Sequence, residues 1–145
     1  MGALAKLAFE DLSVGKTHEV VLVENLSRTQ IVQYAGASGD FNPIHHDELF
    51  ARAAGYPSVF AHGMLSMGLT GRLLTDWLGD GVLRSFGVRF VRQVWPGDTL
   101  RARATVRSLQ AGAEEGLVEL ELVTENQKGE PVVAGQATAA LPHRR

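Results

Sequence analysis

The chain has no cysteine among its 145 residues. Disulfide bonds, thiolate metal sites and a cysteine nucleophile are therefore excluded. The chain also lacks an apolar run that approaches the ~20 residues of a membrane-spanning helix. Its first residues, MGALAKLAFEDL, lack the long apolar core and the cleavage site of a signal peptide. We therefore expect a cytoplasmic protein that does not insert into a membrane.

The chain also lacks a large net charge of either sign. The 14 basic and 16 acidic residues give a net charge of -2, and the basic residues are scattered except for the cluster at 143–145. No nucleic-acid partner is therefore expected. With 45% hydrophobic residues, the composition is that of an ordinary globular domain. A chain of this length can bury a core of its own, so we expect a single domain over residues 1–145.

The first third of the chain alternates between a strand and short helices. Residues 17–24 are rich in valine and predict a strand. Ser27 and Gln30 match a capping box, so a helix should follow. Its buried face should carry Ile31, Tyr34 and Ala35. Asp47 can cap a second, shorter helix.

Residues 62–78 predict a longer helix with apolar side chains over most of its circumference, which indicates burial nearly all round. The segments after this helix alternate between apolar and polar residues, as strands with one wet face do. They are residues 86–90, 100–106, 118–122 and 132–141. We therefore expect an α+β fold in which an antiparallel sheet wraps around one long helix.

The candidate chemistry begins with Asp40 and His45, which lie in a loop between helices. A carboxylate and an imidazole on such a loop can hold one water molecule and exchange protons with it. The same residues also have a structural interpretation. Asp40 can cap a turn, and His45 can be a hydrogen-bonded loop histidine.

A second candidate lies at the start of the long helix, where His62 precedes Gly63. The N-terminus of a helix presents unpaired N–H groups, and a glycine there lets a substrate oxygen approach them closely. An enolate oxyanion would be stabilised at that position. The structural alternative is that Gly63 relieves crowding and that His62 is a satisfied core histidine.

Taken together, these segments resemble a known family. The run GDFNPIH at residues 39–45, followed by AHGM at residues 61–64, is similar to the signature of the MaoC-like family. This family contains R-specific enoyl-thioester hydratases and dehydratases with the hot-dog fold. Within it, the chain looks most like the catalytic subunits of mycobacterial-type (3R)-hydroxyacyl-carrier-protein dehydratases.

The resemblance implies a role for each matched residue. Asp40 and His45 would act on water as an acid–base pair, and the Gly63 amide would bind the thioester carbonyl. Asn42 and Pro43 would brace the loop. No metal and no cofactor are implied. The substrate would be an acyl-CoA or acyl-carrier-protein thioester, and the protein a homodimer or heterodimer of hot-dog subunits.

Some members of the family carry a serine where this chain has Gly71. The hydroxyl group of that serine must here be absent or be supplied by another residue, such as Ser66 or Thr70.

Four other interpretations of the sequence are conceivable. A metal site at His45, His46, Asp47 and His62 is disfavoured because the adjacent histidines point apart and no His-x-x-x-His pair occurs. A serine hydrolase would need a Gly-x-Ser-x-Gly elbow, which is missing. An acyl-thioesterase remains an alternative because hot-dog folds also carry that activity. A subunit whose acyl tunnel is completed by a partner chain also remains.

Overall fold

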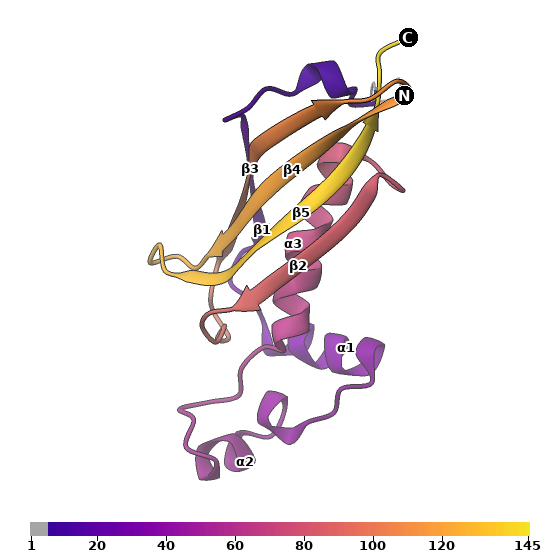
Figure 1. The fold of residues 1–145 in the computed structure, drawn as a ribbon. Helices are drawn as coiled ribbons and strands as arrows, with labels where there is room; N and C mark the ends of the chain where they lie inside the picture. The colour runs from indigo at the N-terminus through magenta and orange to yellow at the C-terminus, as the bar shows by residue number, and fades with distance from the viewer. Residues whose placement is uncertain (1–5) are drawn as a thin grey trace.

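The computed structural model describes residues 6–145, which form one five-stranded antiparallel sheet, three α-helices and two short 3-10 helices (Figure 1). The strands are β1 (Thr17–Val23), β2 (Leu83–Phe90), β3 (Leu100–Ala111), β4 (Glu115–Glu125) and β5 (Pro131–Pro142). The helices are α1 (Arg28–Ser38), α2 (Glu48–Ala53) and α3 (Gly63–Leu78), and the 3-10 helices are η1 (Phe9–Asp11) and η2 (Pro43–His45). The predicted α+β class is confirmed.

The sheet has the strand order β1-β3-β4-β5-β2, so β1 and β2 form its edges. Its long strands have the predicted alternation. In β4, Val118, Leu120 and Leu122 are buried, while Glu119 and Glu121 between them are exposed. This period of two places these three apolar side chains on the face that meets α3, whereas Leu117 lies on the opposite face and is exposed. The other face is left to water.

Helix α3 packs against the inner face of the sheet, through Leu73, Leu74 and Leu78. The prediction that it is buried nearly all round is wrong. Exposed residues recur at every fourth position, namely Met64, Gly68, Arg72 and Asp76. The sheet covers one side of the helix, and within the described residues nothing covers this stripe completely.

Helix α1 begins with the predicted capping box. The Ser27 hydroxyl accepts a hydrogen bond from the Gln30 N–H at 3.0 Å, and the Gln30 side chain accepts one from the Ser27 N–H at 2.9 Å. Of the three residues expected on its buried face, Ile31 and Ala35 are buried and Tyr34 is half-buried. The helix ends at Gly39, whose φ of 76° is the left-handed conformation that glycine adopts without strain. This ending turns the chain into the loop that carries Asp40.

Helices α1 and α2 lie together beyond one end of the sheet, at the end where α3 begins (Figure 1). The fold therefore brings the loop between α1 and α2 close to the first turn of α3. Within residues 6–145, no helix has the length and the apolar character needed to cross a membrane.

Candidate active site

The loop after α1 is shaped by two consecutive side-chain-to-backbone hydrogen bonds. The Asp40 carboxylate accepts from the Asn42 N–H at 3.2 Å, and the Asn42 side-chain oxygen accepts from the Ile44 N–H at 3.2 Å. Pro43 follows as the first residue of η2, where its fixed φ suits a helical start and its missing N–H is not needed. These local contacts place His45 at the end of η2, facing inward.

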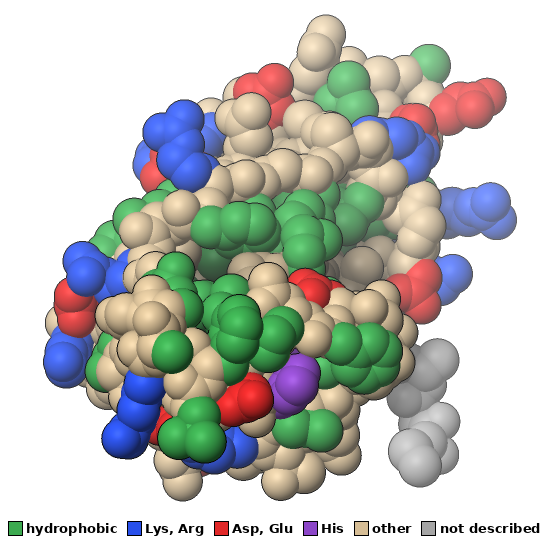
Figure 2. Space-filling model, turned by 90° about the horizontal axis from the view of Figure 1, so that it is seen from below, with side chains coloured by type: hydrophobic (Ala, Val, Ile, Leu, Met, Phe, Trp, Pro, Cys, Tyr) green, Lys and Arg blue, Asp and Glu red, His purple; other side chains and the backbone are tan. Residues whose placement is uncertain are grey.

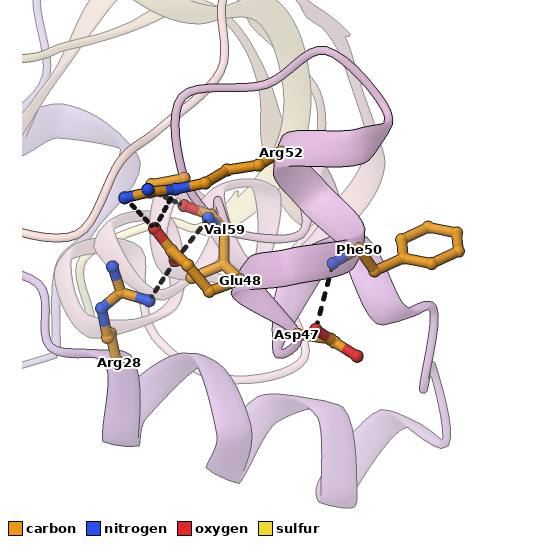
Figure 3. Close-up of polar contacts among 7 residues, drawn as sticks. Arg28, Asp47, Glu48, Phe50, Arg52 and Val59 are labelled. Atoms are coloured by element: carbon orange, nitrogen blue, oxygen red, sulfur yellow. Dashed lines mark hydrogen bonds and ion pairs between the residues drawn. The ribbon is translucent and has the colours of Figure 1, made fainter.

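Glu48, the first residue of α2, braces this region (Figure 3). Its carboxylate pairs with Arg28 of α1 at 2.7 Å and with Arg52 at 3.1 Å, and it accepts from the Val59 N–H at 3.3 Å. The side chains of Arg28 and Glu48 are 54% and 30% exposed, so one such pair contributes at most about 1 kcal/mol. The cluster nevertheless joins α1, α2 and the segment that leads to α3.

His45 is buried, with 7% of its surface exposed. Its Nδ1 lies 2.7 Å from the carbonyl oxygen of Phe60. Because a carbonyl oxygen only accepts, Nδ1 must carry a proton, and in the neutral ring Nε2 has a free lone pair. Burial lowers the pKa of His45 below its ordinary value of 6.5, against an opposing contribution from the Phe60 carbonyl. The ring is therefore available as a base near neutral pH.

The structure brings Asp40, His45 and His62 together. One oxygen or nitrogen atom from each of these three side chains lies within 4.8 Å of the other two. A water molecule that makes two hydrogen bonds of ~2.8 Å bridges groups roughly 4.5 Å apart. Asp40 and His45 are thus separated by a distance that one water can span. Asp40 is exposed, so its carboxylate remains accessible from outside.

His62 is the N-cap of α3 and is 2% exposed. Its Nε2 donates to the backbone carbonyl of Asp40 at 3.0 Å. Its ring stacks on His45, with centroids 3.8 Å apart and planes inclined by 27°. Its Nδ1 is buried and has no hydrogen-bond partner among residues 6–145. An unpaired buried acceptor of this kind typically costs about 1–3 kcal/mol.

The stacking bears on the metal alternative. The lone pairs of an imidazole lie in the plane of its ring, and the His45 and His62 planes are only 27° apart. Two stacked and nearly parallel planes do not meet close to both rings, whereas a zinc ion would have to lie in both planes at ~2.0–2.1 Å from each nitrogen. Of the residues weighed for a metal, His46 and Asp47 are not part of the cluster.

A pocket of about 270 Å³ is lined by Ala61 and Gly63, the two neighbours of His62 in the chain, and not by Asp40, His45 or His62 themselves. Its walls come from the start of α3, the end of β2, the segment 91–94 and strand β5. Gly63, the first residue of α3, is part of the wall, as is the half-exposed ring of Phe90. Figure 2 views the molecule from this end and shows hydrophobic side chains gathered across the middle of the face.

A side chain at position 63 would have little space. A Cβ atom there would lie 3.1 to 3.2 Å from three ring carbons of Phe90, which is closer than ordinary contact. The backbone of Gly63 thus meets the pocket directly, without a side chain between. At the first position of a helix its N–H has no partner within the helix. A ligand oxygen in the pocket can bind there.

The hydroxyl groups near Gly71 differ in availability. Gly71 faces Phe86, because an added Cβ would lie 3.1 Å from the ring of that residue. Thr70 is fully buried, and its hydroxyl is engaged with the Ser66 carbonyl at 2.9 Å and the Thr124 hydroxyl at 2.7 Å. Ser66 lines the pocket with Gly63, one helical turn away. Ser66 is the one residue with a hydroxyl group among those that line the pocket.

The sequence did not indicate two parts of this site. The hydrogen bond from His62 to Asp40 joins residues 22 positions apart, and only the position of His62 beside Gly63 could have suggested its role. The pocket walls contributed by Phe90, Val132 and Val133 carry no polar signal. The sequence identifies these residues only as strand residues, because their position beside α3 depends on the sheet order.

The chain is similar to proteins of a known family. Residues 11–128 match the family model described as MaoC like domain. The (R)-specific enoyl-CoA hydratase of Rhodospirillum rubrum is 33% identical over 138 residues, which cover 94% of this chain and 92% of that protein. In three longer curated relatives, the chain spans only 11%, 7% and 31% of their length.

Solved structures are similar as well. R-hydratase PhaJ1 from Pseudomonas aeruginosa, in the unliganded form, superposes with a TM-score of 0.84 at 28% identity, covering 96% of this chain and 88% of that chain. A chain of the ChsH1–ChsH2 complex from Mycobacterium tuberculosis superposes with a TM-score of 0.77 at 27% identity, covering 89% and 98%. The expected hot-dog fold, a sheet wrapped around a central helix, is confirmed.

Proposed function

The chain belongs to the MaoC-like domain family, and from that premise we propose that it hydrates trans-2-enoyl thioesters R-specifically and catalyses the reverse dehydration of (3R)-hydroxyacyl thioesters. The observation that carries the proposal is the approach of the Asp40 carboxylate and the His45 ring to within 4.8 Å of each other. They meet beside the pocket that Gly63 lines. We also propose that residues 1–145 act as one hot-dog domain.

In the proposed mechanism, Asp40 and His45 hold one water between them. His45 takes a proton at Nε2, because its Nδ1 is committed to the Phe60 carbonyl. The Asp40 carboxylate accepts the other hydrogen of the water and orients its oxygen toward carbon three of the enoyl group. The O–H bond breaks as the C–O bond forms, and the electron pair of the double bond moves toward the thioester carbonyl.

The proton then leaves His45 for carbon two, which restores the neutral ring. Since a single group receives and returns the proton, both new bonds form on the same face of the substrate, as a syn addition. The Gly63 N–H donates to the thioester carbonyl oxygen, where negative charge builds up in the transition state. The dipole of α3 adds to that stabilisation. Asn42 and Pro43 hold the loop that carries the pair.

The proposed substrate is an acyl thioester of coenzyme A or of an acyl-carrier protein. The proposed assembly is a dimer of hot-dog subunits, with itself or with a related chain. Strands β1 and β2 leave two sheet edges, and the pocket beside Phe90 is open, which favours completion by a second subunit. In a heteromeric pair this chain is the catalytic member, like the dehydratase subunits it resembles, because it has Asp40, His45 and Gly63. A size measurement that finds a stable and fully active monomer would contradict the dimer.

The test is an ultraviolet assay of enoyl-thioester hydration, across acyl lengths and with both carriers. Hydration removes the conjugated absorbance, whereas a thioesterase releases a free thiol that a thiol reagent detects. We expect the absorbance to fall without thiol release. Thiol release without hydration would favour the thioesterase alternative and refute the proposal.

A further inference from the structure

His62 contacts both members of the proposed acid–base pair and immediately precedes Gly63. Its Nε2 bonds the Asp40 backbone carbonyl at 3.0 Å, and its ring stacks on the His45 ring at 3.8 Å. Tyr34 of α1 packs edge-on against it from another side, with centroids 4.8 Å apart. With 2% of its surface exposed, His62 has little freedom to move. It therefore connects the loop, the base and the start of α3 rigidly.

The bond to Asp40 is the one that anchors this loop residue to a distant part of the chain. The other hydrogen bonds of Asp40 are local, from its own N–H to the Ser38 hydroxyl and from the Asn42 N–H to its carboxylate. Bonds between residues two apart shape the loop but do not restrict its motion relative to α3. A bond to a buried side chain 22 residues away restricts that motion.

The unpaired Nδ1 argues against a role in stability alone. A core residue chosen only to fill space would leave no buried nitrogen without a partner, since such atoms are unfavourable. An imidazole at this position supplies what an apolar residue lacks, a flat ring against His45 together with a donor at Nε2. Both features act on the acid–base pair.

We propose that His62 is a positioning residue that fixes Asp40 relative to His45, by its Nε2–H bond to the Asp40 carbonyl and by its stacking on the His45 ring. The inference rests on the proposed hydratase function. His62 makes no contact with the substrate in this role. It acts through the two residues that hold the water, and it links their geometry to the amide of Gly63, which follows it in the chain.

Two substitutions separate the two contacts. His62→Phe keeps a flat ring on His45 and removes the donor, whereas His62→Gln keeps a donor at similar reach and removes the ring. Displacement of a reacting group by about 1 Å costs roughly 100-fold, and loss of a supporting partner about 10–100-fold. We expect His62→Phe to lower kcat about 10–100-fold with KM within about threefold of the parent. His62→Gln should recover part of that loss.

His18 offers a matched control. It is a partly buried histidine on β1 that stacks on Trp77 with centroids 4.7 Å apart, near the opposite end of α3. His18→Phe and His18→Gln make the same changes outside the site, and kcat should stay near that of the parent. Thermal unfolding of all four variants is measured alongside, and His62→Phe should unfold within a few degrees of the parent because it removes the unpaired nitrogen.

A parent-like kcat in His62→Phe would overturn the positioning role, as would a loss that appears in KM alone. If neither His62 variant folds, nitrogen NMR of the unaltered protein decides. A proton on Nε2 of His62 supports the bond to Asp40, and a proton on Nδ1 with a bare Nε2 overturns it. A parent without hydratase activity would instead refute the proposed function, and the NMR result would still report on the bond.

Discussion

Replacing Asp40 with asparagine removes the charge of the proposed acid–base pair and keeps its shape. The Asp40 side chain is exposed, and its carboxylate accepts one hydrogen bond, from the Asn42 N–H at 3.2 Å. The amide oxygen of an asparagine can accept the same bond. The bond to His62 uses the backbone carbonyl of Asp40 and is unaffected. We therefore expect the free energy of unfolding to change by less than about 0.5 kcal/mol.

The effect on activity should be far larger. The Asp40 charge orients the water and favours the protonated His45 ring that forms in the reaction, and asparagine lacks this charge. Loss of one member of an acid–base pair lowers the rate about 10²–10⁴-fold, which corresponds to about 2.7–5.4 kcal/mol of transition-state stabilisation. His45→Ala should lose as much activity, and it also perturbs the fold. The His45 ring is 7% exposed, and its removal leaves the Phe60 carbonyl without its partner, at about 1–3 kcal/mol of unfolding free energy. Asp40→Asn is therefore the better test of the two, because it changes activity without perturbing the fold.

The assay is hydration of crotonyl-CoA followed by loss of ultraviolet absorbance, with thermal unfolding of the same samples. Asp47→Asn is the matched control. Asp47 is an exposed carboxylate on the same loop, and it caps α2 by accepting from the Phe50 N–H at 3.1 Å, a bond that asparagine retains. The control should hydrate at the parent rate. If Asp40→Asn also does so, and both unfold like the parent, the assignment of Asp40 is refuted.

Three further predictions concern the pocket and the C-terminal segment. Gly63→Ala would place a methyl group 3.1 Å from the Phe90 ring, which is 50% exposed and can shift outward, so the thermal stability should not change. The value of kcat/KM should fall about 10-fold, because the methyl group displaces the substrate from the amide. An unchanged kcat/KM would contradict this prediction. Ser66→Ala should lower kcat/KM about 3–10-fold, which corresponds to the loss of one hydrogen bond to the substrate, and the thermal stability should not change. Kinetics like those of the parent would exclude that hydrogen bond. The pKa of His143 should exceed 6.5, because its two ring nitrogens face the Gly112 carbonyl and the Glu10 carboxylate. NMR should show the contact between His143 and Glu10 weakening as the pH rises through that pKa, since the ring then loses its charge. A pKa at or below 6.5 would contradict it.

Much of the scaffold could be predicted because its signals are local. The alternation of Val118, Leu120 and Leu122 with glutamates depends only on the period of a strand. The capping box at Ser27 depends only on residues three apart. The burial of α3 was overestimated for the opposite reason. Which side of an apolar helix is covered depends on the extent of the sheet, and periodicity does not contain that extent.

The site was predictable only where its contacts are local. The turn from Asp40 through Asn42 to Pro43 is formed by bonds between residues two apart, and its composition is typical of a turn. The pocket, in contrast, is closed by Phe90 and by strand β5. These come from the second half of the chain, and their place beside α3 depends on the sheet order β1-β3-β4-β5-β2.

The difference between these two kinds of contact explains why the motif alone was ambiguous. Asp40 and His45 would satisfy the same local bonds in a merely structural loop. What distinguishes the site is that His45 is held by the Phe60 carbonyl, 15 residues away, so that one defined nitrogen remains free. His62 then ties Asp40 to the start of α3, where Gly63 presents its amide to the pocket. Long-range hydrogen bonds to buried groups thus fix the orientation of Asp40 and His45 in an otherwise common turn. The variants at position 62 test the bond to Asp40.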